Sequence, residues 1–130
     1  MSEQVRIVLV EDNKVFREAL ELLLGLRSDV EVVAAVGDGT EAVPACVEYE
    51  PDVMLIDYRL PGMDGVQATA AVKAMCPEVA IVCLTATATG AEVEALFAAG
   101  AVACLRKDQE LEQIVAAIRS AATGRLARAE

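Results

Sequence analysis

Five short and almost continuously apolar segments recur along the chain, at residues 5–10, 30–36, 53–57, 80–85 and 101–106. Continuous apolar runs of this length are typical of strands that are buried on both faces of a parallel sheet. Between them, apolar residues recur every three or four positions, which is the spacing of amphipathic helices. The pattern therefore predicts an α/β fold, a doubly wound five-stranded parallel sheet with helices on both faces.

The intervening segments predict helices over residues 15–26, 40–49, 64–76, 91–99 and 108–122. Pro44 should disturb the first turn or two of the second helix, and Pro77 forbids continuation of the third. Gly100 is expected to end the fourth helix. Asp108 is expected to cap the last helix, which should stop before Gly124.

Polar side chains follow four of the apolar segments directly, namely Glu11, Asp12, Asp57, Thr85 and Lys107. Each alone has an ordinary explanation, such as capping a helix or facing solvent. In a parallel sheet with the first strand inside, however, the carboxyl ends of these strands meet at one edge. We therefore expect the five side chains to converge.

Three converging carboxylates disfavour one another's ionised forms unless a positive charge lies among them. Mg²⁺ suits such a cluster, because it prefers a few carboxylates plus water and leaves positions for phosphate oxygens. The ammonium of Lys107 and the hydroxyl of Thr85 are suited to hold an incoming phosphoryl group. Together these groups suggest Asp57 as a nucleophile that forms an aspartyl phosphate.

Four motifs in this order resemble the receiver (CheY-like) domain of bacterial two-component response regulators, which has a flavodoxin-like fold: VLVEDN, VMLIDYRLPGMDG, LTA and GAVACLRKD. The resemblance covers nearly the whole chain and implies that Asp57 is the phosphoacceptor. It implies that Thr85 and Lys107 contact the phosphoryl group. It also implies Mg²⁺ bound by Asp12, Asp57, the backbone carbonyl of Arg59 and, through water, Glu11. The phosphoryl group would come from a sensor histidine kinase.

Residues 111–125 are similar to the last helix of receivers of the NarL/FixJ (LuxR-type) class, which usually precedes a DNA-binding helix-turn-helix domain. This resemblance implies a receiver at 1–124 and the start of a linker or tail at 125–130, with the output domain absent from this chain. The expected output is transcription, with DNA contacted only through that domain. A stand-alone regulator that acts by protein–protein interaction is the alternative. A homodimer is expected on phosphorylation, with the alanine-rich last helix as the favoured face.

The composition of the chain limits the kinds of partner that it is expected to bind. The chain has 130 residues with 11 Lys+Arg against 21 Asp+Glu, a net charge of -10 that would repel the DNA backbone. Aromatic residues make up 3%, which argues against a stacking surface for single-stranded nucleic acid. The absence of a run of about 20 apolar residues and of a signal-peptide core indicates a cytoplasmic protein without a membrane partner.

The four cysteines have no CxxC spacing and no histidine to complete a zinc site, so we interpret them as small buried hydrophobes. Cys104 occupies the position at which receivers usually carry Tyr or Phe. A thiol is too small to move through the volume of an aromatic ring. We therefore expect activation to rely on displacement of the loop at 86–91.

Three other functions fit the fold less well. A nucleotide or flavin binder would need a glycine-rich loop after the first strand, where this chain has EDN, and GDG at 37–39 is only a turn. A phosphatase with an aspartate nucleophile would carry a second Asp at the position of Arg59. An interaction module that is never phosphorylated would not need the complete set of Asp12, Asp57, Thr85 and Lys107. The chain is therefore not expected to be an enzyme, beyond assisting its own phosphotransfer and dephosphorylation.

Overall fold

A parallel sheet forms the centre of the computed structural model, which describes residues 4–129. Its five strands are β1 (Val5–Val10), β2 (Val30–Val36), β3 (Val53–Asp57), β4 (Ala80–Thr85) and β5 (Ala103–Arg106). Their order is β2-β1-β3-β4-β5, so the direction of winding reverses between β1 and β3. The predicted doubly wound fold is confirmed, with β1 inside the sheet and β3 at its middle.

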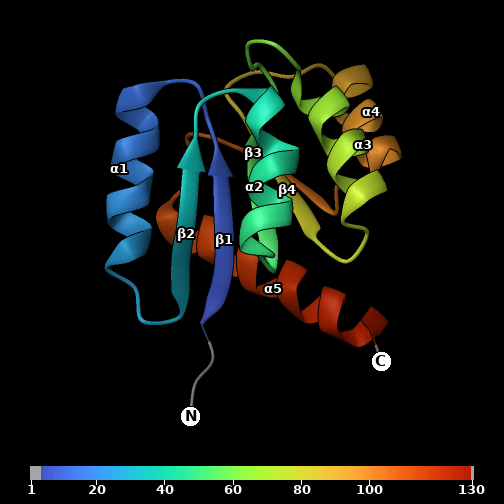
Figure 1. Cartoon of the computed structure of the whole chain (residues 1–130). Coiled ribbons are helices and arrows are strands. Elements are labelled where there is room, and N and C mark those ends of the chain that lie inside the picture. The colour runs from blue at the N-terminus through green and yellow to red at the C-terminus, as the bar shows by residue number, and fades with distance from the viewer. Residues whose placement is uncertain (1–3, 130) are drawn as a thin grey trace.

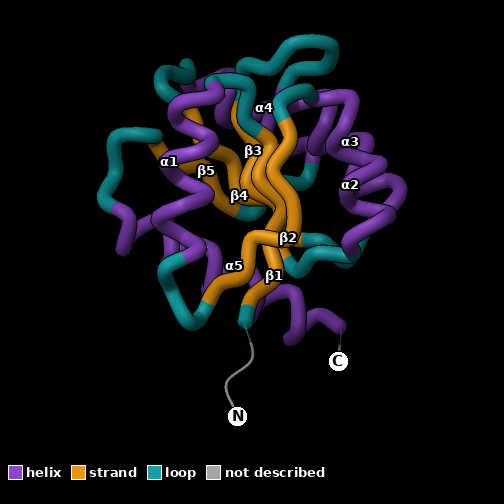
Figure 2. Tube along the Cα trace, turned by 60° about the vertical axis from the view of Figure 1, so that its left-hand side comes forward, coloured by secondary structure: helices purple, strands orange, loops and turns teal. Residues whose placement is uncertain are grey.

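Helices cover both faces of the sheet (Figures 1 and 2). One face packs against α1 (Lys14–Gly25) and α5 (Leu111–Ala129), and the other against α2 (Ala42–Tyr49), α3 (Gly65–Met75) and α4 (Gly90–Ala99). Every residue of β3 and β4 is buried, with neighbours such as Leu55 and Ile56 pointing into opposite layers. Burial on both faces explains why these strands are continuously apolar.

Side-chain caps fix where three of the helices begin. Asn13 accepts a hydrogen bond from the backbone at the start of α1. Asp64 and Gln67 form a capping box at the start of α3, with distances of 2.8 and 3.0 Å. Thr89 and Glu92 form a second capping box at the start of α4. Each cap satisfies backbone N–H groups that the helix leaves unpaired, so these loops lead directly into helices.

Pro44 lies in the first turn of α2, where a helix does not need its N–H as a donor. The preceding turn, residues 39–41, is a 3-10 helix, so the α-helix begins at Ala42 rather than at residue 40. Gly100 ends α4 with a φ of 123°, a left-handed conformation that favours glycine. The N–H of Ala101 donates to Leu96, and β5 begins only at Ala103, two residues later than predicted.

The prediction for the last helix was wrong at both ends. The carboxylate of Asp108 binds the guanidinium of Arg106 instead of capping, and α5 begins at Leu111. Gly124 lies within the helix, because Ala121, Ala122 and Arg125 nearby are good helix formers and one glycine costs only about 1 kcal/mol. Of the predicted tail, residues 125–129 continue α5 and residue 130 lies outside the described residues. Neither α5 nor any other helix between residues 4 and 129 is both long and apolar enough to cross a membrane.

The turn after β2 packs against the loop that follows β3. Gly39 is buried, and its N–H donates to the carbonyl of Pro61 at 3.3 Å. A Cβ atom at residue 39 would lie 2.0 Å from the carbonyl oxygen of Met63, which is too close for any side chain. Glycine at this position therefore lets the β3–α3 loop lie close to the turn.

Replacing Gly39 with Ala should lower the free energy of unfolding by about 1–3 kcal/mol, because the new methyl group would push the two loops apart. Unfolding in urea measures the difference. Gly90→Ala is the matched control, since a Cβ there would meet nothing within 4 Å. Equal stability of the two variants would contradict the close contact between the turn at Gly39 and the β3–α3 loop.

Candidate functional site

The carboxyl ends of β1, β3, β4 and β5 meet at one edge of the sheet, toward which the arrows of β1 and β2 point in Figure 1. All five polar side chains that follow the apolar segments lie at this edge: Glu11, Asp12, Asp57, Thr85 and Lys107. Glu11, Asp57 and Thr85 are buried, Lys107 is half-buried and Asp12 is exposed. The site is therefore largely closed by protein and opens to solvent beside Asp12.

Lys107 links two of the carboxylates. Its Nζ lies 2.9 Å from Oδ2 of Asp57 and 2.6 Å from Oε1 of Glu11. Burial alone would lower the pKa of Lys107, but its contacts with the two carboxylates raise that pKa above the ordinary value. The lysine is therefore a fixed positive charge, held directly against the side chain of Asp57.

Glu11 is a carboxylate in an unfavourable environment. Its side chain is 1% exposed, and only Oε2 accepts a well-directed hydrogen bond, from the N–H of Asn13 at 2.9 Å. Oε1 pairs with the charge of Lys107 but makes no well-directed hydrogen bond. Burial raises the pKa of Glu11, and the negative charge of Asp57 adds to this effect, against the opposing influence of Lys107 and Asn13. Glu11 would therefore ionise more readily if further positive charge were nearby.

A divalent metal ion would supply that charge. Glu11, Asp12 and Asp57 each offer an oxygen atom, and these three atoms lie within 4.8 Å of one another. Three carboxylates face one lysine, so the cluster keeps an excess of negative charge when all of them are ionised. Oε1 of Glu11 is paired with Lys107 but makes no well-directed hydrogen bond, so it could also accept one from a metal-bound water. The residues present thus fit a hydrated divalent cation.

The backbone carbonyl of Arg59 lies in the loop beside this cluster. No described residue donates a hydrogen bond to it, so its oxygen is available as a ligand. A cleft of about 410 Å³ opens here and is lined by Asp12, Arg59, Pro61, Asp64 and two neighbouring residues of the loop. Two of the four predicted ligands, Asp12 and Arg59, therefore border one open cleft.

The hydroxyl of Thr85 is already engaged within its own loop. It donates to the carbonyl of Thr87 at 2.9 Å. Thr85 lies one residue beyond Leu84, which is in register with Asp57 at the end of β3. A new acceptor on Asp57 would therefore compete with the carbonyl of Thr87 for this hydroxyl.

The first turns of α1 contribute two residues that the sequence did not reveal. The ring of Phe16 lies 4.9 Å from Nζ of Lys107, which is a cation–π distance. Arg17 donates to the backbone carbonyl of Glu11 at 2.7 Å. In the sequence, Phe16 is simply an apolar position of a helix, and only the docking of α1 brings it to the site.

A second unforeseen link joins the loop after β3 to α4. A hydrogen bond with Glu92 raises the pKa of Tyr58, and burial adds to the effect. The guanidinium of Arg59 lies 3.9 Å from the same carboxylate. The spacing of Thr89 and Glu92 indicates a capping box in the sequence, but the contacts with Tyr58 and Arg59 depend on tertiary structure. Through Glu92, the residues next to Asp57 are connected to the start of α4.

Comparisons with known proteins agree with this arrangement. A family model described as the response regulator receiver domain matches residues 7–119. The chain is 36% identical over 123 residues to the transcriptional regulatory protein LiaR of Bacillus subtilis, and 37% identical over 123 residues to the probable transcriptional regulatory protein NarL of Mycobacterium tuberculosis. These alignments cover 92% and 95% of this chain but 57% of each relative, so the chain spans little more than half of their length.

Solved structures of similar proteins share the fold. The signal receiver domain of the putative response regulator NarL from Mycobacterium tuberculosis superposes with a TM-score of 0.87 at 37% identity, covering 94% of this chain and 98% of that one. A LuxR-family two-component response regulator from Aurantimonas sp. SI85-9A1 gives a TM-score of 0.88 at 30% identity, covering 94% of this chain and 87% of that one. The helices and strands around the carboxylate cluster are therefore arranged as in these proteins.

Replacing Lys107 with Met should destabilise the protein by about 3 kcal/mol at neutral pH, because Glu11 and Asp57 would lose their buried counter-charge. Unfolding in urea measures the loss, and Mg²⁺ should restore more stability to this variant than to the wild type. Lys14→Met, at an exposed position of α1, should have little effect. Adding Glu11→Gln should recover much of the loss. Equal stability of the wild type and Lys107→Met would mean that the ion pair contributes nothing.

Proposed function

The chain belongs to the family of response regulator receiver domains, and on that basis we propose that it accepts a phosphoryl group on Asp57 from a sensor histidine kinase. The conformational change that follows would control an output. The observation that carries this proposal is the 2.9 Å contact between Asp57 and Lys107 beside the acidic pair Glu11 and Asp12. It combines a nucleophile, a fixed positive charge and a set of metal ligands at one strand end.

In the proposed reaction, a carboxylate oxygen of Asp57 attacks the phosphorus atom of a phosphohistidine. A P–O bond forms while the P–N bond breaks, and the electron pair of that bond returns to the histidine of the kinase. Lys107 is placed to stabilise negative charge on the phosphoryl oxygens, because it already lies against Asp57. The loop after β3 would keep Asp57 in place, since the N–H of Arg59 contacts its Oδ1 at 3.4 Å.

We assign Mg²⁺ as the cofactor, held by Asp12, Asp57, the carbonyl of Arg59 and, through water, Glu11. When bound, it supplies the positive charge that the cluster lacks and offers positions for phosphoryl oxygens. The exposure of Asp12 would let the ion enter from the cleft. This chain would then assist its own phosphorylation and dephosphorylation without turning over a separate substrate.

Thr85 is the proposed first step of the conformational change. On phosphorylation its hydroxyl would leave the carbonyl of Thr87 and donate to a phosphoryl oxygen, which frees the loop at 86–91. Cys104 lies half-buried in the layer beneath α4, where most receivers would hold an aromatic ring. Because a thiol occupies little volume, the loop rather than a rotating ring would carry the signal toward α4.

The proposed output is control of transcription, because the relatives reported above are named as transcriptional regulatory proteins. The net charge of -10 disfavours contact between these residues and DNA, so DNA would be bound through another domain. A cytoplasmic location follows from the proposed kinase and transcriptional roles. It also agrees with the four cysteines, which are free thiols.

A second copy of the chain is the other proposed partner, in a homodimer that forms on phosphorylation. Val15, Leu22 and Leu26 are exposed apolar side chains in and just after α1. On α5, Ala121 and Ala122 pack into the protein's own core, so they are not available for a partner. We therefore favour a face in which α1 supplies the apolar contacts. The polar surface of α5 would lie beside it, because Arg27 and Glu112 join the two helices at 2.7 Å.

Incubation with Mg²⁺ and acetyl phosphate should add one phosphoryl group, about 80 Da, to the intact protein, and Asp57→Asn should abolish the gain because the amide is not a nucleophile. Intact-mass spectrometry measures it. Removing Mg²⁺ with EDTA should also abolish it. Asp64→Asn is the matched control, since Asn still caps α3. A gain that persists in Asp57→Asn would disprove the assigned phosphoacceptor, and steady hydrolysis of a phosphate ester would favour a phosphatase.

Adding beryllofluoride, which mimics the aspartyl phosphate, should shift the backbone amide resonances of residues 86–91 because Thr85 would release the carbonyl of Thr87. Thr85→Val lacks the hydroxyl and should lose most of these changes, whereas Thr85→Ser should keep them. Two-dimensional NMR spectra compare the variants. The proposed role of Thr85 would be wrong if the resonances of residues 86–91 stayed unchanged in the wild type while those of residues around Asp57 shifted.

A further inference from the structure

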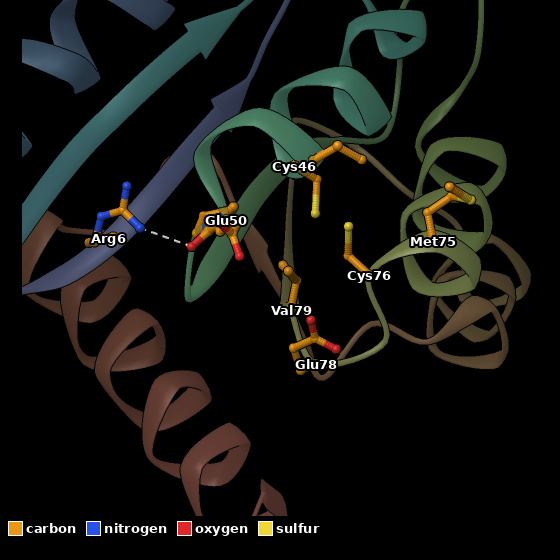
Figure 3. Close-up of a pocket in the computed structure, with 9 residues that line it drawn as sticks. Arg6, Cys46, Glu50, Met75, Cys76, Glu78 and Val79 are labelled. Carbon is orange, nitrogen blue, oxygen red and sulfur yellow. Dashed lines mark hydrogen bonds between the residues drawn. The ribbon is translucent and has the colours of Figure 1, made fainter.

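Cys46 and Cys76 meet at the edge of the sheet opposite to Asp57. Cys46 lies on α2, and Cys76 follows directly after α3. Figure 3 shows their sulfur atoms pointing toward each other across the gap between the two helices. The thiol of Cys76 lies close enough to help raise the pKa of Cys46, after burial as the larger cause. A sulfur atom on α2 and a sulfur atom just after α3 thus face each other without a covalent bond.

The two cysteines differ in their access to solvent. Cys46 is 1% exposed, whereas Cys76 is partly exposed. Both line a cavity of about 490 Å³, together with Arg6, Glu50, Met75 and Glu78 (Figure 3). Cys76 is therefore the more accessible of the two residues to a small solute that enters this cavity.

We propose that Cys46 and Cys76 are a redox pair that forms a reversible disulfide when the protein meets a hydroperoxide. The sulfur of Cys76 attacks one peroxide oxygen, the O–O bond breaks, and sulfenic acid and water form from hydrogen peroxide. The sulfur of Cys46 then attacks that of Cys76, and the sulfenic hydroxyl leaves as a second water with the proton of Cys46. Two thiols lose two electrons in all, and the peroxide gains them.

The order of these steps follows from the environment of each sulfur. Burial, followed by the neighbouring thiol of Cys76, raises the pKa of Cys46 to about 12. Cys46 therefore remains a thiol at neutral pH and is a poor first nucleophile. It is well placed for the second step, because its target would be the sulfur that it already faces.

The other two cysteines do not form a comparable pair. Cys83 and Cys104 are opposite each other in the register of β4 and β5. Cys83 is completely buried within the sheet, where a peroxide has no path to its sulfur. These two residues can therefore be replaced to isolate the reaction of Cys46 and Cys76.

The bond would join α2 to α3 and close the chain between residues 46 and 76, which includes all of β3. Closing this loop restricts the unfolded chain and so stabilises the fold. The two thiols and their cavity lie at the other end of the strands from Asp57, so their oxidation can be tested separately from phosphorylation of Asp57.

The variant Cys83→Ala/Cys104→Ala, which keeps only this pair, should lose about 2 Da on treatment with about one equivalent of hydrogen peroxide, as two hydrogens leave. Its free thiols should fall from two to none, its Tm should rise by roughly 5–10 °C, and dithiothreitol should reverse both changes. Peptide mapping of the oxidised wild type without reductant should give a peptide pair joined through Cys46 and Cys76. This mapping also decides the matter if the double variant folds poorly.

In the otherwise wild-type protein, Cys76→Ser should abolish the loss of about 2 Da. The control variant Cys104→Ser, also made in the wild type, should still show it. A gain of about 16 or 32 Da on Cys76 with Cys46 still free would overturn the proposal, because the partner would then have failed to act. A disulfide between two copies of the chain, or one through Cys83, would overturn it as well.

Discussion

The contact of Lys107 with Glu11 and Asp57 is the interaction on which the functional edge of the sheet depends. Parallel strands carry their carboxyl ends to one side, and here the ends of β1 and β3 bring three acidic groups together. An acidic cluster that is largely closed from water is costly unless a cation neutralises part of it. The lysine after β5 provides that charge, so the last strand must be in place before the cluster is stable. The groups that would bind the metal and the phosphoryl group, Glu11, Asp12, Asp57 and Lys107, therefore also affect the stability of the fold.

The sequence indicated most of the sheet and the main chemical groups of the site, because both depend on local signals. A run such as VMLID indicates a strand buried on both faces, and the carboxyl ends of parallel strands meet at one edge of the sheet. The sequence was less informative where two groups compete for the same side chain. Asp108 looked like a helix cap, yet the nearby guanidinium of Arg106 binds it more directly. Contacts such as those of Phe16 with Lys107 and of Tyr58 with Glu92 join distant segments, so no local pattern predicted them.

The cysteines illustrate the same limit. We interpreted all four as buried hydrophobes, and this holds for Cys46 and Cys83, whereas Cys76 and Cys104 are partly exposed. No short motif links Cys46 to Cys76, because thirty positions separate them in the chain. Only the packing of α2 beside α3 on one face of the sheet, with the C-terminal ends of both helices at the same edge, brings their sulfur atoms face to face. Spacing rules for metal and redox motifs describe local pairs, and this pair is made by topology.

The separation of the carboxylates from these thiols divides the molecule by coordination preference. One edge of the sheet offers hard oxygen ligands, and the opposite edge offers two soft sulfur ligands beside the thioether of Met75. Hard ions such as Mg²⁺ and soft ions such as Cu(I) prefer these two ligand types respectively. The depth of the sheet keeps the two sets of donors apart. A reagent that reacts with thiols and a hard cation would therefore act at opposite ends of the same strands.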